Sequence, residues 1–88
     1  MLTNRQLIIL FEHMLNVSLT SDSTNIKALA NLLSAINGRS ANSIRTNIRS
    51  GIDYTSPAVH NDIDLLEELV RPVSPTLANL LKNSKEEK

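Results

Sequence analysis

Apolar residues recur every three or four positions along this chain, a spacing that predicts four or five helices. The first helix begins at Thr3, which forms a capping box with Gln6, and runs to about Asn16. The other helices are predicted over residues 25–37, over residues 41–50, before Arg71-Pro72, and after Ser74-Pro75. The β-branched alternation of a half-buried strand is missing, so the predicted fold class is all-α.

Glycine and small polar residues mark the ends of the second and third helices. Gly38 is expected to end the second helix, because glycine adopts the left-handed conformation without a Cβ clash. Ser40 is placed to cap the third helix. The loop over residues 18–25 ends in two candidates for the N-cap of the second helix, Ser23 and Thr24.

The fourth helix has two candidate starting points. It could begin at Ser56 with Pro57 as its first residue, or later, at Asn61 or Asp62. We favour the later start, because Asp62 would otherwise fall inside the apolar arc of the helix, whereas an N-cap carboxylate accepts free backbone N–H groups.

Each predicted helix has one apolar face, expected to lie in the core. In chain order these faces are Leu7, Ile8, Leu10, Phe11, Met14 and Leu15; Ile26, Leu29, Ala30, Leu32, Leu33 and Ile36; Ala41, Ile44 and Ile48; Ile63, Leu66, Leu69 and Val70; and Leu77, Leu80 and Leu81. Ile9 falls on the opposite side of the first helix. It is therefore expected to be either a singly exposed isoleucine, which is common, or a contact with a partner.

The length of 88 residues corresponds to one domain. A chain of this size buries only about 60 to 65 per cent of its unfolded surface, so one core is all it can build. We predict a single helical domain over residues 1–81 and a charged, disordered tail over residues 82–88.

Several classes of function lack the residues that they need. The chain has no cysteine, and its two histidines, His13 and His60, lie far apart, so we expect no metal and no cofactor. Neither a glycine-rich phosphate loop nor a nucleophile with a base is apparent, so we expect no enzyme and no small-molecule substrate. The apolar run Leu7–Phe11 is too short for a signal peptide or a membrane span, which predicts a cytoplasmic protein.

Charge is distributed unevenly, although the formal net charge is zero. The segment from Ser23 to Ile52 contains four basic residues and no acidic one, whereas Asp53 to Glu68 contains five acidic residues and no lysine or arginine. Any attraction to nucleic acid must therefore come from the arrangement of the charges.

The basic segment is predicted to form a helix, a short turn and a second helix. A cationic, amide-rich helix after a glycine turn is typical of a major-groove reader, because phosphates bind cations and base edges bind forked donors and acceptors. An ordinary αα-hairpin with solvated charges is the alternative. Single-stranded RNA is a weaker hypothesis, because exposed aromatic rings are scarce. The candidate DNA-binding residues are Lys27, Arg39, Ser40, Asn42, Ser43, Arg45, Thr46, Asn47 and Arg49.

The sequence also resembles a family of regulators. The opening run 2–7, the run from Lys27 to Ser40 with the following Ser43-Ile44-Arg45, and Asp64-Leu65-Leu66 are similar to the C-terminal helical region of RteC-type regulators of Bacteroidetes conjugative transposons. Those regulators contain a helix-turn-helix and turn on excision genes. The resemblance implies a DNA-binding regulator of transcription or a mobile-element accessory factor.

Together, these patterns predict a four- to five-helix domain in which the second and third helices form a helix-turn-helix that binds double-stranded DNA. Few phosphate contacts are available to one copy, so a homodimer or a larger regulatory partner is expected for tight binding. The alternative is a helical protein–protein interaction module without nucleic-acid binding, whose apolar surface includes Ile9 or the C-terminal leucines.

Overall fold

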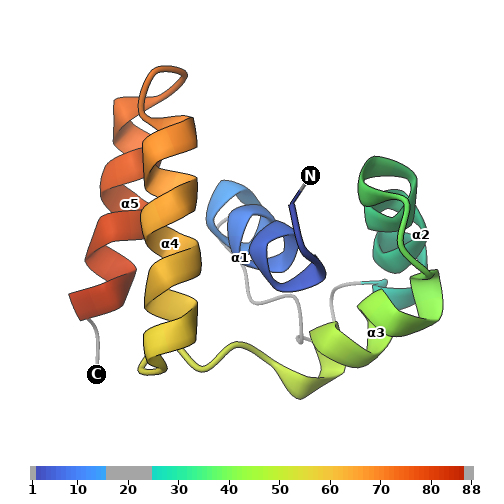
Figure 1. Cartoon of the computed structure of the whole chain (residues 1–88). Helices are drawn as coiled ribbons and strands as arrows, with labels where there is room; N and C mark the ends of the chain where they lie inside the picture. Colours follow the sequence, from blue (N-terminus) through green and yellow to red (C-terminus); the bar gives the residue numbers. More distant parts are fainter. Residues whose placement is uncertain (1, 16–24, 87–88) are drawn as a thin grey trace. The chain divides into compact units, whose positions relative to one another are not determined.

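The computed structural model describes residues 2–15 and 25–86, and all its regular secondary structure is helical (Figure 1). The five helices are α1 (Asn4–Leu15), α2 (Ile26–Asn37), α3 (Ala41–Ser50), α4 (Pro57–Val70) and α5 (Pro75–Glu86). No strand occurs in the described part of the chain, and the predicted all-α class is confirmed.

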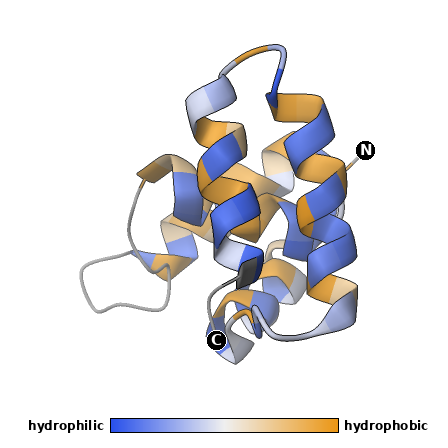
Figure 2. Ribbon diagram, turned by 90° about the vertical axis from the view of Figure 1, so that its left-hand side faces the viewer, coloured by the Kyte–Doolittle hydropathy of each residue, from blue (hydrophilic) through white to orange (hydrophobic). Residues whose placement is uncertain are grey.

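The chain divides into two compact units, which we call the N-terminal unit (residues 1–51) and the C-terminal unit (residues 52–88). In the N-terminal unit, α1 contacts both α2 and α3, and α2 contacts α3. In the C-terminal unit, α4 and α5 lie side by side and run antiparallel (Figure 1). Figure 2 shows apolar and polar residues alternating along the helices, as expected when each helix buries one face.

Local interactions explain where the first three helices begin. Gln6 donates its backbone N–H to Oγ1 of Thr3 at 3.2 Å, and the N–H of Thr3 donates to Oε1 of Gln6 at 2.9 Å, so the predicted capping box is present. Ser40 caps α3 as predicted, accepting from the N–H of Ser43 at 3.3 Å. The N-cap of α2 is Asn25, whose Oδ1 accepts from the N–H of Ala28, so the prediction of Ser23 or Thr24 as this cap was wrong; both of those residues lie outside the described residues.

Two glycines end α2 and α3 in conformations that favour glycine. Gly38 has φ of 72° and ψ of 7°, the left-handed region, and donates its N–H to the carbonyl of Ser34. Gly51 has φ of 76° and ψ of 177°, a region that is nearly restricted to glycine. The prediction that α2 ends at Gly38 is confirmed.

The boundaries of α4 and α5 differ from our predictions. The prediction of a start at Asn61 or Asp62 was wrong, because α4 begins at Pro57. The N–H groups in the first turn of a helix have no intrahelical acceptor, so the N–H that proline lacks is not missed there. Asp62 is therefore inside the helix and largely buried. At the other end, α5 continues to Glu86, so residues 82–86, which we expected in the tail, are helical, while residues 87–88 lie outside the described part.

Some of the predicted apolar faces are only partly buried. Ile9, expected outside the core, is fully buried. Leu7–Phe11 are five consecutive apolar residues, so their side chains point in every direction around the helix axis. Such a pattern is typical of a helix that is packed on more than one side. Conversely, six residues placed on apolar faces are exposed: Met14, Leu15, Leu32, Ile36, Leu69 and Leu80.

Candidate nucleic-acid interface

The third helix presents most of its side chains to solvent. Its buried contacts are confined to Ile44 and Ile48, one turn apart, so a narrow apolar seam holds the helix to the N-terminal unit. The candidate residues that are exposed are Lys27, Arg39, Ser40, Asn42, Ser43, Thr46, Asn47 and Arg49, while Arg45 is half-buried. The structure thus brings the candidates on α3 together on one helix and leaves them accessible.

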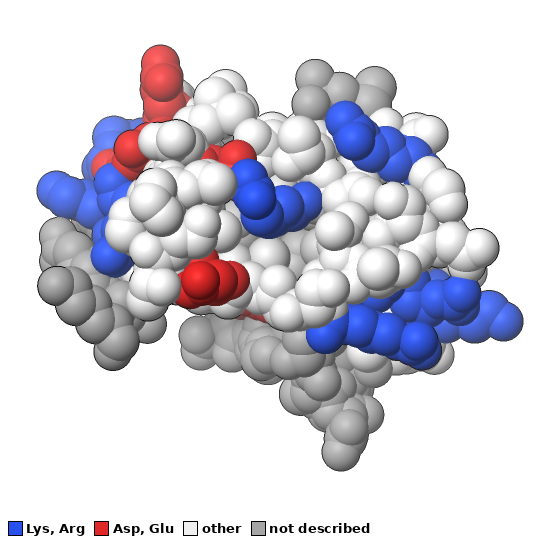
Figure 3. Space-filling model, turned by 60° about the horizontal axis from the view of Figure 1, so that its bottom comes forward, with Lys and Arg blue, Asp and Glu red and all other residues white. Residues whose placement is uncertain are grey.

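The basic side chains of this surface are not paired with any acidic group in the part of the chain that the structure describes. Among the described residues, Lys27, Arg39, Arg45 and Arg49 form no ion pair. Figure 3 shows blue lysine and arginine side chains in separate groups, and those on the right-hand side have no red side chain beside them. This surface therefore keeps its positive charge for a ligand.

Arg45 has a partner of a different kind. Its Nη2 donates to Oδ1 of Asn42, three residues earlier on the same helix. This contact holds the half-buried guanidinium along α3 and leaves its charge uncompensated, because the amide is neutral.

A buried network of amides joins the three helices of the N-terminal unit. Asn4 and Asn37 are 7% and 4% exposed, and Nδ2 of Asn37 donates to Oδ1 of Asn4 at 2.8 Å. Nδ2 of Asn4 in turn lies 3.0 Å from Oδ1 of Asn47 and 3.4 Å from Oγ of Ser43, both on α3. The start of α1 is therefore bonded both to the end of α2 and to the candidate recognition helix.

The turn between α2 and α3 belongs to the same network. The N–H of Arg39 donates to Oδ1 of Asn37 at 3.0 Å, and Oγ of Ser34 donates to the carbonyl of Arg39. Both backbone polar groups of Arg39 are thus satisfied by α2, and its side chain remains exposed.

Sequence patterns did not identify Asn4 or Asn37 as part of this site. A signal was nevertheless present, because the helical period places Asn37 on the same face as Ala30 and Leu33. A polar residue on a buried face needs hydrogen-bond partners, and Asn4 supplies one.

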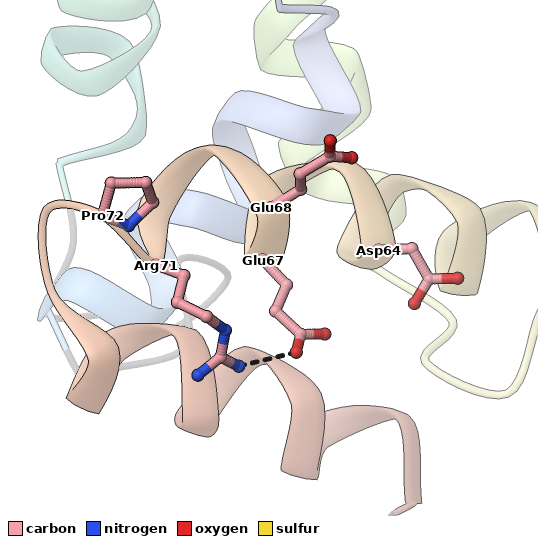
Figure 4. A pocket seen from close by; sticks show the side chains of 5 residues that line it. All are labelled: Asp64, Glu67, Glu68, Arg71 and Pro72. Atoms are coloured by element: carbon pink, nitrogen blue, oxygen red, sulfur yellow. Dashed lines mark hydrogen bonds and ion pairs between the residues drawn. The ribbon is translucent and has the colours of Figure 1, made fainter.

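The C-terminal unit differs in its electrostatics. Glu67 and Arg71 form an ion pair of 2.7 Å on α4, and Lys85 of α5 pairs with Asp64. An open surface depression of about 480 Å³ is lined by Asp64, Glu67, Glu68, Arg71 and Pro72. Figure 4 shows how these side chains lie. The one cation that lines the depression is bonded to Glu67, while Glu68 points away from that pair, so the polar groups do not converge on one point.

Both histidines have structural partners. Nδ1 of His13 lies 2.8 Å from the carbonyl of Ile9, and Nε2 of His60 lies 2.7 Å from the carbonyl of Tyr54. The described residues contain no group of three or more histidine, aspartate or glutamate side chains arranged to hold a metal ion.

No helix in the described part of the chain has the length and apolar character needed to cross a bilayer. No protein-family model matches the sequence, and comparison with curated proteins and with solved structures gives no match.

Proposed function

We propose that the N-terminal unit binds double-stranded DNA, with α2, the turn at residues 38–40 and α3 acting as a helix-turn-helix. The observation that carries the proposal is the exposed face of α3 and its turn, whose arginines have no ion pair among the described residues. A helix of ten residues is about 15 Å long, enough for one crossing of the major groove.

The packing around α3 fits this role. A recognition helix must be held firmly by few of its residues, so that the others can contact DNA. Ile44 and Ile48 provide the apolar attachment, and Asn47 and Ser43 add polar contacts to Asn4. Arg49, Asn42 and Thr46 remain on the exposed arc.

The resemblance to RteC-type regulators supports a role in transcription or as a mobile-element accessory factor, acting in the cytoplasm. One copy offers four cations in the region 25–51, so we expect weak binding by a monomer. A homodimer or a larger regulatory partner would add the second half-site that tight operator binding requires.

The test uses the full-length protein and a pool of short random duplexes in low salt, with binding followed by fluorescence anisotropy. We expect Arg45→Ala and Arg49→Ala each to weaken binding by about 1 to 3 kcal/mol if they reach base edges. The matched control, Arg71→Ala with Lys82→Ala, removes two cations from the C-terminal unit and should leave binding close to that of the wild type. An Arg45/Arg49 double variant that is folded and binds normally would contradict the proposal.

A helical protein-interaction module is the second candidate. It is favoured by apolar side chains that remain exposed on α4 and α5: Leu65, Leu69 and Leu80 are 40%, 54% and 48% exposed. Two measurements distinguish the two functions: light scattering gives the oligomeric state, and retention on a column of immobilised duplex reports DNA binding. An oligomer whose size does not change with salt, and which the column does not retain, would favour the interaction module.

A further inference from the structure

The direction of the hydrogen bonds in the buried amide network is fixed by the backbone. The N–H of Arg39 can only donate, so the atom of Asn37 that faces it is the oxygen Oδ1. The nitrogen of the same amide, Nδ2, therefore points the other way, where it meets the carbonyl of Leu2 at 3.5 Å and Oδ1 of Asn4. The carbonyl of Leu2 can only accept, so the atom of Asn37 that faces it must be the donor Nδ2. The contacts on the two sides of the amide therefore give the same orientation of Asn37.

This direction continues through Asn4 to α3. Because Oδ1 of Asn4 accepts from Asn37, Nδ2 of Asn4 is the atom that donates to Oδ1 of Asn47. Asn47 is an exposed residue of α3, and its amide oxygen is engaged inside the protein. What Asn47 offers to a ligand is its NH₂ group, a donor with no partner among the described residues.

The side-chain amide of Asn42 also has its oxygen bonded within the protein, by a different contact. Its Oδ1 accepts from Nη2 of Arg45, which leaves its NH₂ group for a ligand. Thr46 and Ser50 direct their hydroxyl hydrogens to backbone carbonyls of α3, so outward they present only neutral oxygens. The exposed arc thus combines these neutral acceptors with the amide donors and the guanidinium of Arg49. The guanidinium is its strongest group, because charged donors make hydrogen bonds roughly twice as strong as neutral ones.

From this polarity we infer that α3 reads guanine in the major groove and discriminates against adenine, with Arg49 as the principal base contact and Asn42 and Asn47 as additional donors. Guanine presents two acceptors there, N7 and O6, whereas adenine presents the acceptor N7 beside the donor N6. An asparagine that reads adenine must accept from N6 with its amide oxygen, and in both asparagines that oxygen already accepts one hydrogen bond within the protein. The inference rests on the proposed DNA-binding function and assigns it a base preference.

The experiment selects bound sequences from a random duplex pool with the full-length protein and then replaces single bases in the best duplex. Exchange of guanine for 7-deazaguanine removes the N7 acceptor and preserves base pairing. At the contacted guanines we expect this exchange to weaken binding by about five- to a hundredfold. The matched exchange of adenine for 7-deazaadenine in the same duplex should change binding by less than about twofold.

Arg49→Ala assigns the contact to a residue. The side chain is exposed, so its removal should not disturb the fold, and circular dichroism verifies this. At the guanine that Arg49 contacts, the variant should bind guanine and 7-deazaguanine duplexes to within about twofold of each other. If it keeps the full difference, Arg49 is not the reader.

The two proposals fail in different ways. Selected duplexes without a preferred guanine, or tight binding that 7-deazaguanine leaves unchanged, would overturn the guanine preference while DNA binding stands. If no duplex in the pool is bound at low salt, the proposed function itself fails, and the base preference fails with it.

Discussion

Nδ2 of Asn37, at the end of α2, lies 2.8 Å from Oδ1 of Asn4, at the start of α1, and both side chains are buried. The two residues are 33 positions apart in the sequence. Because a buried amide without partners is costly, this bond fixes how α1 and α2 meet. Through Asn4 it also fixes the orientation of Asn47 on α3.

Asn37→Ala should therefore destabilise the N-terminal unit by about 1 to 3 kcal/mol, because it leaves a buried acceptor on Asn4 without its donor. Asn31→Ala is the matched control, since Asn31 is an exposed asparagine on the same helix, and it should change stability by less than about 0.5 kcal/mol. Urea unfolding followed by circular dichroism measures both. In a double-mutant cycle, Asn4→Ala and Asn37→Ala should be non-additive, and simple additivity would show that the two amides act independently.

The two glycines should respond differently to alanine. A Cβ would meet no atom within 4 Å at either Gly38 or Gly51, so the cost of substitution comes from the backbone alone. For Gly38→Ala, in the left-handed region, we expect about 1 kcal/mol, and Gly38→Asn should be milder because asparagine tolerates this conformation. Gly51→Ala should cost about 1 to 3 kcal/mol. Thermal unfolding of the three variants measures their relative stabilities. Equal losses of stability for Gly38→Ala and Gly51→Ala would contradict the argument from backbone conformation.

Leu66 and Leu69, on the same helix, are 1% and 54% exposed. Leu66→Ala should destabilise the C-terminal unit by about 2 to 5 kcal/mol, because it leaves a cavity at a fully buried position. Leu69→Ala should cost less than about 1 kcal/mol. Hydrogen exchange of amides in α4 reports on both variants; a larger loss for Leu69 would show that this side chain packs against something in solution.

Asp53 should titrate below its ordinary range. Its Oδ1 accepts from Oγ1 of Thr55 at 2.6 Å and from the N–H of Thr55 at 3.0 Å, and these bonds, the side-chain one first, hold the pKa of Asp53 below 3.8. A lowered folded pKa stabilises the fold above pH 3.8, and this contribution is lost as the pH falls through the folded pKa. In Thr55→Val, an NMR titration of the Asp53 carboxylate should give a midpoint closer to 3.8; an unchanged midpoint would exclude the hydroxyl as the main cause.

Lys27 should contribute to DNA affinity through charge alone. It is exposed on α2 and has no ion pair among the described residues. Lys27→Ala should weaken binding to all duplexes about equally and reduce the slope of log affinity against log salt by about 1. Lys82→Ala, on α5, serves as the control and should leave the slope unchanged. A sequence-dependent effect of Lys27→Ala would indicate a base contact instead.

Much of the fold and of the exposed surface could be predicted because short-range interactions decide them. The Thr3–Gln6 capping box, the Ser40 cap and the left-handed Gly38 each involve residues within four positions of one another. The exposure of Arg49 and Asn42 follows from the spacing of Ile44 and Ile48, because a helix with one narrow apolar seam turns its other residues outward. Whether these residues bind DNA stays a prediction.

The errors lie where packing decides. Ile9 is buried although it falls outside the main apolar arc, and Leu32 and Ile36 are exposed although they fall within one. The period of a helix gives the direction of a side chain, but only the neighbouring helices determine whether anything covers it. Asp62 led to the wrong start for α4, because we assumed that a carboxylate could not lie inside the buried arc of a helix.

By itself, the sequence determined the helical class, the order of the five helices, the capping box of α1, the glycine that ends α2, the serine that caps α3, and the separation of basic from acidic segments. These features depend on residues close together in the chain, whose interactions form within a turn or two of helix. The tertiary structure alone decided that Asn4 and Asn37 meet, and hence which atom of Asn47 is bonded to Asn4. That orientation depends on hydrogen bonds among three helices, and no local pattern encodes the direction of a bond whose partners come together only on folding.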